Sequence, residues 1–313
     1  SLNKNQIISL PIAVSSGYVQ QNVNGGAIRS KGLEAIIDIT PLQRRRFKWN
    51  TLINFTAYRN RVETLPDQAK TITLGYNRVY DIVNQTVWYQ VQEGGRMGDM
   101  WGTGYLKNAN GDFVINKTGG YIADNTLKKL GNYNPDFMVG LNNNFTYKNI
   151  NAAFLVDWRQ GGILVSRTLA LAAVGGQLIE TADRPEAGIA AKGVVNTGTA
   201  ESPVYQPNTV AVSAETYYRQ YYDRNHEENN TYKASYVKLR EVQLGYQLPA
   251  SALGKYIQSI SVSLVARNVF AISDMRHFDP EQTAFQGQKF LSGVEDMSYP
   301  TSRSLGVKLS LTF

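Results

Sequence analysis

The chain has few side chains that could perform acid–base or nucleophilic chemistry. Its 313 residues include two histidines and no cysteine, which excludes a thiol nucleophile and a cysteine-ligated metal. His277 and Asp279 are two residues apart, a spacing that places them on one strand face or within one turn, and no nucleophile motif accompanies them. We therefore expect that this protein is not an enzyme.

Two stretches carry side chains that bind cations in other proteins. Residues 226–230 (His-Glu-Glu-Asn-Asn) contain groups that suit a metal, with a solvated loop as the alternative. Asp274, Asp279 and Glu281 have oxygens that suit Ca²⁺, with a proline-stabilised turn as the alternative. We expect a solvated loop in the first stretch and a proline-stabilised turn in the second, and we therefore expect neither a metal nor a cofactor.

Aromatic residues are better candidates for binding. Residues 213–223 are expected to form a short helix with four tyrosines clustered on one side. The four are Tyr217, Tyr218, Tyr221 and Tyr222. They either pack this segment onto its neighbours or form a platform on which a ligand stacks.

The elements that position these residues are predicted by a period of two. From residue 305 onward every odd position is apolar and every even one is small or polar, so the two sets lie on opposite faces of one strand. The odd set is Leu305, Val307, Leu309, Leu311 and Phe313. The same alternation predicts strands in residues 33–39, 47–58, 137–146, 152–159 and 260–267, with a weaker one in residues 6–10.

Residues 236–248 form a further strand with one flaw. The apolar residues from 242 onward keep one phase, whereas Val237 and Leu239 keep the other. A β-bulge near Arg240 and Glu241 would add one residue and reset the phase. The sequence therefore predicts about eight strands.

Charged residues fall on the polar faces of these strands. They either pair with one another along a wet wall or line a path for a ligand; Asp157 and Arg159 are the candidates for the second role. The full set is Glu34, Asp38, Lys48, Asp157, Arg159, Arg267 and Lys308.

The connections between strands alternate between short and long. The short ones are residues 41–46, 148–151 and 249–256, and the long ones are residues 63–135, 161–233 and 271–301. An up-and-down antiparallel barrel places every second connection at the same rim, and transmembrane barrels of the bacterial outer membrane have short periplasmic turns and long extracellular loops. We therefore expect an all-β, antiparallel transmembrane barrel segment.

Composition is compatible with this placement. Mean hydropathy is −0.31, and the longest apolar stretches are far shorter than the ~20 residues of a spanning helix. The net charge of +7 indicates attraction to anionic lipid headgroups or to anionic ligands. Nucleic acid is not expected, because only residues 44–46 form a basic run. The first residues lack the pattern of a signal peptide, so we expect a mature piece or an internal fragment.

Several motifs, taken in order, resemble the C-terminal barrel portion of a SusC/RagA-type TonB-dependent outer-membrane transporter of Bacteroidetes. The most specific is residues 236–249, YVKLREVQLGYQLP. The others are NGGAIRSKGLE at 24–34, FKWN to NRV at 47–62, LGNYNP at 130–135, ARNVF at 266–270, DPE at 279–281, Tyr299-Pro300 and the final Phe313. The resemblance covers nearly the whole chain.

The resemblance implies a 22-stranded barrel with a plugged lumen, of which residues 1–313 supply the C-terminal strands. It implies that the plug, the first strands and the segment that contacts TonB are absent here. It implies import of large nutrients, either glycans or oligopeptides, together with a SusD-like surface lipoprotein. It also implies that the barrel insertion machinery recognises Phe313 as an assembly signal. Two alternatives stay open: an outer-membrane barrel with an adhesive or assembly role, and a soluble β-sandwich binding module.

Overall fold

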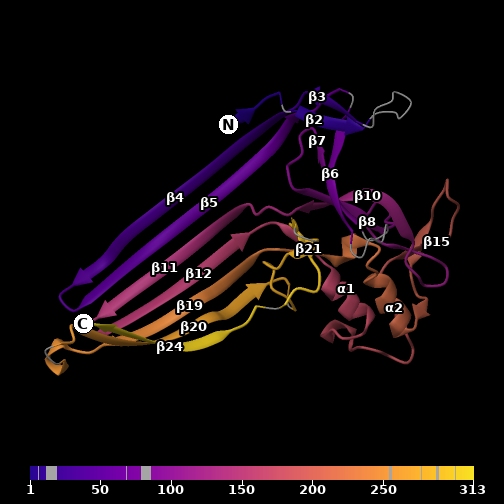
Figure 1. Cartoon of the computed structure of the whole chain (residues 1–313). Helices are drawn as coiled ribbons and strands as arrows, with labels where there is room; N and C mark the ends of the chain where they lie inside the picture. The colour runs from indigo at the N-terminus through magenta and orange to yellow at the C-terminus, as the bar shows by residue number, and fades with distance from the viewer. Residues whose placement is uncertain are drawn as a thin grey trace.

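The computed structural model describes residues 1–5, 7–11, 20–67, 69–78, 86–253, 256–275, 277–286, 289–299 and 301–313. Eight antiparallel strands form one continuous sheet, with neighbours in the order β1-β4-β5-β11-β12-β19-β20-β24 (Figure 1). They are β1 (Leu2–Asn3), β4 (Ala27–Arg44), β5 (Phe47–Thr64), β11 (Phe137–Tyr147), β12 (Ile150–Gln160), β19 (Tyr236–Gln247), β20 (Ser259–Ser273) and β24 (Ser304–Thr312). A single sheet of this kind differs from the two packed sheets of a sandwich.

Seven of the eight predicted strands belong to this sheet; the strand predicted at residues 6–10 is present but is not part of it. Residues 7–11 form β2 (Ile7–Pro11), which pairs with β3 (Gln20–Asn24) in a separate hairpin. The short β1 takes the place beside β4 instead, with Leu2 opposite Arg29. A nearby partner was available to β2, so alternation alone did not decide which strand it joined. Gln6 lies outside the described residues.

The predicted bulge is confirmed, and it explains the phase flaw in β19. Leu155 of β12 pairs with Glu241, and the next residue, Val156, pairs with Leu239, so Arg240 is the extra residue. The insertion returns Val237 and Leu239 to the apolar face.

The apolar face of the sheet is open to its surroundings. On β24, the side chains of Leu305, Val307, Leu309 and Leu311 are 81, 71, 59 and 46% exposed. Their partners across the ladder on β20 continue the same face, as with Val262 opposite Leu309. Such a broad exposed apolar surface is stable only in contact with another apolar phase.

The two kinds of connection lie at opposite ends of the sheet (Figure 1). The short turns lie at one end, together with the chain's C-terminus, and one of them contains the 3₁₀ turn η5 (Ala250–Ala252). The other end carries loop A (residues 65–136), loop B (residues 161–235) and loop C (residues 274–303). We call these the short-turn end and the long-loop end.

The long loops have regular structure of their own. Loop A contains β6 (Thr71–Arg78), β7 (Thr86–Gln92), β8 (Asp99–Tyr105), β9 (Val114–Ile115) and β10 (Ala123–Asn132). Loop B contains β13 (Ile163–Ser166), α1 (Arg167–Val174), η3 (Ile179–Thr181), β14 (Ile189–Ala190), β15 (Val194–Asn196), β16 (Tyr205–Pro207), β17 (Ala211–Val212), α2 (Ala214–Tyr221), η4 (Glu227–Asn230) and β18 (Thr231–Lys233). Loop C contains β21 (Ala284–Gln286), β22 (Lys289–Leu291) and β23 (Val294–Glu295). No helix in these described ranges is long and apolar enough to cross a bilayer.

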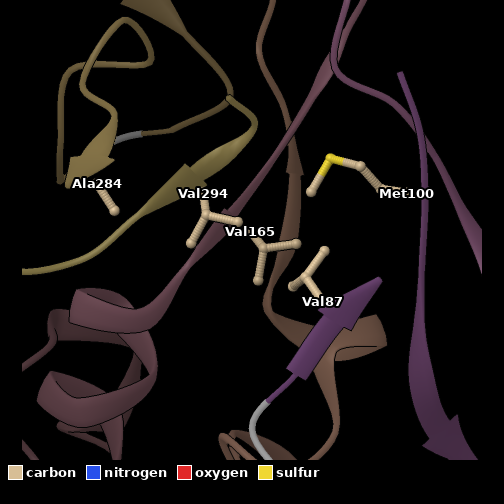
Figure 2. Close-up of a cluster of buried hydrophobic side chains, with 5 residues drawn as sticks. All are labelled: Val87, Met100, Val165, Ala284 and Val294. Atoms are coloured by element: carbon tan, nitrogen blue, oxygen red, sulfur yellow. The ribbon is translucent and has the colours of Figure 1, made fainter. Parts of the chain in front are cut away.

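The three loops share a hydrophobic core, which was not predicted. Val87 and Met100 of loop A, Val165 of loop B, and Ala284 and Val294 of loop C are buried against one another (Figure 2). The parallel pairing of β13 with β23 joins loops B and C beside this core. The loops are therefore packed into one body rather than hanging separately from the sheet.

Candidate functional site

A cavity of about 600 Å³ lies at the long-loop end, between loops A and B. Its volume and its aromatic lining are typical of sites that bind small molecules or short polymers. The charged side chains of Asp112 and Lys192 also line it. The aromatic residues are Phe113, Tyr121, Tyr217 and Tyr221.

Helix α2 supplies two of these aromatic rings. The helix begins where the hydroxyl of Ser213 accepts a hydrogen bond from the backbone N–H of Thr216, as predicted for residues 213–223. Tyr217 and Tyr221 are four residues apart, and their rings stack with centroids 6.0 Å apart and planes 16° apart. This pair therefore presents a continuous aromatic surface to the cavity.

The other two predicted tyrosines do not line this cavity. The Tyr218 hydroxyl donates a hydrogen bond of 2.9 Å to the carbonyl oxygen of Asp183. The Tyr222 ring packs edge-on against Tyr221, with centroids 4.9 Å apart. The four tyrosines are thus divided: Tyr217 and Tyr221 could stack a ligand, whereas the contacts of Tyr218 and Tyr222 are those of packing residues.

Loop A supplies the opposite side of the cavity. Phe113 and Tyr121 pack edge to face at 5.4 Å, and the Tyr121 ring lies 5.8 Å from that of Tyr221. Phe113 follows a tight turn at Gly111, where an Asn-Gly pair predicts a hairpin and where Lys107 pairs with Phe113. The sequence located this hairpin but did not indicate that it meets the tyrosine helix.

Tyr105 fixes the two loops together behind the cavity. Its ring is buried, 5.0 Å from the Tyr121 ring and 4.7 Å from the His226 ring, and its hydroxyl donates to the carbonyl oxygen of Gln220. Burial raises the pKa of both Tyr105 and Tyr121, so both phenols remain neutral donors. The aromatic wall is consequently positioned before any ligand arrives.

The stretch around His226 is not a solvated loop, because His226 and Glu227 are buried. A carboxylate oxygen of Glu227 accepts a hydrogen bond of 3.1 Å from the Thr103 backbone, and the other lies 3.6 Å from the Arg167 guanidinium. Burial, opposed by Arg167, raises the pKa of Glu227 to about 7. Within the described ranges, no three His, Asp or Glu side chains are grouped as metal ligands. Through these contacts, residues 226–230 of loop B pack against loop A.

A cluster of charges attaches loop C to the polar face of the sheet. Glu281 accepts 2.6 Å hydrogen bonds from the Tyr236 hydroxyl, the Lys238 ammonium and the Arg240 guanidinium. Asp279 accepts from Lys238 as well. We call Asp279, Glu281, Tyr236, Lys238 and Arg240 the loop C latch. Two of the three carboxylates considered as Ca²⁺ ligands, Asp279 and Glu281, are thus held by cations.

The bulge in β19 makes this latch possible. In a regular strand Arg240 and Glu241 would point to opposite faces. Because Arg240 is the extra residue, both side chains reach the polar face: Arg240 Nη2 lies 2.6 Å from Asp157, and Glu241 lies 2.9 Å from Arg267. Sequence reasoning located the bulge but did not identify Arg240 or Lys238 as functional.

The remaining predicted residues lie apart from the cavity. Asp157 joins the latch through Arg240, and Arg159 donates a 2.7 Å hydrogen bond to the carbonyl oxygen of Tyr133. His277 contacts Glu180 at 2.8 Å rather than Asp279. Phe313 is exposed at the short-turn end. The structure therefore does not join Asp157 and Arg159 to the tyrosines in one site.

Comparison with known proteins gives relatives of one kind. The chain is 27% identical over 326 residues to TonB-dependent receptor P3 of Formosa agariphila, a match that covers 97% of this chain and 30% of the relative. It is 23% identical to TonB-dependent receptor P26 of the same organism, covering 98% of this chain and 31% of that protein. No family model matches the chain. The chain thus spans about a third of the length of these relatives.

Solved structures with a similar fold agree with these relatives. The whole chain superposes on 32% of a chain from the RagAB peptide importer in its open-open state, with a TM-score of 0.66 and 16% sequence identity. A second structure, of the RagAB peptide transporter, gives a TM-score of 0.63 at 15% identity with the same coverage. At these identities the likeness establishes the fold.

Proposed function

We propose that this chain, which has the sequence and fold of a SusC/RagA-type TonB-dependent receptor segment, forms part of the wall of an importer of large nutrients in a bacterial outer membrane. One observation carries the proposal: a single antiparallel sheet has an exposed apolar face and carries all its long loops at one end. In a bilayer that face contacts lipid, and the long loops are extracellular.

Further strands are needed to complete the barrel. Along most of β4 and along the whole of β24, the outer edge has no strand partner within the described part of the chain. Unpaired backbone groups facing hydrocarbon cost several kcal/mol each, so only a closed barrel is stable there. We propose that residues 1–313 are the C-terminal strands of a 22-stranded barrel, and that the plug and the TonB-contacting segment belong to the rest of the receptor.

The aromatic cavity is proposed as a contact site for cargo at the extracellular end. Aromatic faces bind both sugar rings and the apolar side chains of peptides, so the lining suits a glycan or an oligopeptide. The RagAB structures with this fold are those of a peptide transporter and of a peptide importer, which favours the oligopeptide. A SusD-like surface lipoprotein is the proposed partner that delivers cargo to this end.

Replacing Tyr217 and Tyr221 together by Ala is expected to weaken cargo binding by about tenfold, because two stacked rings are lost from the cavity wall. The measurement is binding of a fluorescent oligopeptide mixture, and separately of a soluble glycan mixture, to the full-length receptor. Tyr299→Ala removes a fully exposed tyrosine from loop C and serves as the matched control. Equal binding by the double variant and the control would contradict a role for the cavity.

Deleting Phe313 is expected to lower the amount of receptor in the outer membrane, because the terminal aromatic is proposed as the signal for the insertion machinery. Surface labelling of whole cells measures this amount. Deleting Glu201, an exposed residue of loop B, is the control. Undiminished surface labelling after loss of Phe313 would remove this role.

A further inference from the structure

The net positive charge of the chain arises in four segments of the sequence, three around the short turns and one in the final strand. Residues 39–50, 143–152, 242–263 and 304–313 contain no Asp or Glu. They contain seven of the 32 Lys and Arg residues, and the other 25 balance the 25 Asp and Glu. The seven are Arg44, Arg45, Arg46, Lys48, Lys148, Lys255 and Lys308. The whole formal charge of +7 therefore arises in this part of the sequence.

Arg44 is placed on the apolar face by an irregularity in β4. Ile39 pairs with Thr51 and Leu42 pairs with Trp49, so β4 has one extra residue at this point. The following pair is Arg44 opposite Phe47, on the same face as Trp49. An arginine on the lipid-facing side is stable only if its guanidinium extends to the level of the headgroups.

Two neighbouring turns bring more cations to the same place. Arg45 and Arg46 form the turn after β4, and the backbone N–H of Lys148, in the next turn of this kind, donates a 2.9 Å hydrogen bond to the carbonyl oxygen of Arg46. All four basic side chains are exposed. Within the described ranges none of the four forms an ion pair, so their charges are available to an outside anion.

An aromatic band lies beside these cations on the apolar face. The rings of Trp49 and Phe145 stack at 5.8 Å, and Phe47 lies 6.4 Å from Phe145. Tyr147 pairs with Phe47 across the ladder. Rows of aromatic residues mark the interface between hydrocarbon and headgroups in membrane barrels. The cations beyond this row are therefore at the depth of lipid phosphates.

We propose that Arg44, Arg45, Arg46 and Lys148 form a binding site for the phosphate of an anionic phospholipid in the periplasmic leaflet. Guanidinium groups bind phosphate oxygens with two parallel hydrogen bonds, and the aromatic row provides contacts for the acyl chains. The aromatic row favours a lipid over a soluble anion, which would need only the charges. The site depends on the membrane placement proposed above.

The test is native mass spectrometry of the full-length receptor, released from detergent micelles that contain equal amounts of phosphatidylglycerol and phosphatidylcholine. The unmodified receptor is expected to retain phosphatidylglycerol in excess. The R44Q/R45Q/R46Q variant is expected to lose that preference by about a hundredfold, because each of the three cations near an anionic surface contributes about fivefold and the three factors multiply. The R44K/R45K/R46K variant keeps the charges and is expected to retain most of it.

The control variant is K117Q/R219Q/K233Q, which removes three exposed cations from the long-loop end. Heat-modified mobility on gels shows that each variant still forms a barrel. An unchanged phosphatidylglycerol excess in R44Q/R45Q/R46Q, or an equal loss in the control, would overturn the site. If adding inorganic phosphate is enough to abolish lipid retention, the site binds a free anion, and the proposal that it binds a phospholipid is overturned. A receptor that dissolves without detergent would instead contradict the membrane placement.

Discussion

A receptor carrying Leu309→Arg is expected to reach the outer membrane in greatly reduced amount. Leu309 lies on the apolar face of β24 opposite Val262, and its side chain is 59% exposed. A guanidinium facing the hydrocarbon costs about 2–4 kcal/mol near the middle of a bilayer. The measurement is the folded fraction in isolated outer membranes, scored by heat-modified mobility on gels.

Lys308→Ala is the matched control for this substitution, because it changes the adjacent residue on the other face. Lys308 pairs with Ser263 on the polar face, where water is available to either side chain. We expect a small effect. Similar losses of folded receptor for the two variants would contradict the assignment of faces on which the membrane placement depends.

Glu281→Gln is expected to release loop C from the sheet. The substitution removes the negative charge that contacts both Lys238 and Arg240. Lys238 is only 5% exposed, and its ammonium group would be left with Asp279 as its acidic partner. Because about a third of the Glu281 side chain is exposed, we expect a loss of about 2 kcal/mol rather than the full cost of breaking a buried pair. Amide hydrogen exchange of residues 278–283 measures the release.

The latch is also expected to open in acid. Burial alone would raise the pKa of Glu281, but hydrogen bonds from Arg240, Lys238 and Tyr236 outweigh it and lower the pKa from 4.5 to about 2. A lowered pKa stabilises the docked loop above pH 4.5, and this contribution is lost as the pH falls towards 2. Asp274→Asn, an exposed loop C variant, is the control. The quantity compared is the protection factor, which is the exchange rate relative to the intrinsic rate at the same pH. Lower protection in Glu281→Gln at neutral pH, together with protection that does not change with pH in the unmodified receptor, would argue against this titration.

The sheet was predictable because it is periodic. Alternation located seven of its strands, and the phase change between Leu239 and Val242 located the bulge at Arg240. The helix bearing Tyr217 and Tyr221 was predicted because the spacing of its tyrosines is a local signal.

The cavity and the latch were not predictable in this way. The contacts between Tyr121 and helix α2 join residues about a hundred positions apart, and no pattern within either segment specifies them. The ion pair between Glu281 and Lys238 was not predictable either. In the sequence, Glu281 was a possible cation ligand and Lys238 was only a residue of a predicted strand. The shared core shows the difference most clearly, since Val87, Val165 and Val294 lie in separate loops with unrelated sequences.

The shared core makes the packing of each long loop depend on the others. Val87 and Met100 come from the first third of the chain, whereas Ala284 and Val294 belong to the connection just before the final strand. The apolar surface of loop A at Val87 and Met100 stays uncovered until loop C packs against it. Completion of the loop core is thereby tied to the arrival of loop C, and a chain in which loop C is not yet docked would expose apolar surface to its neighbours.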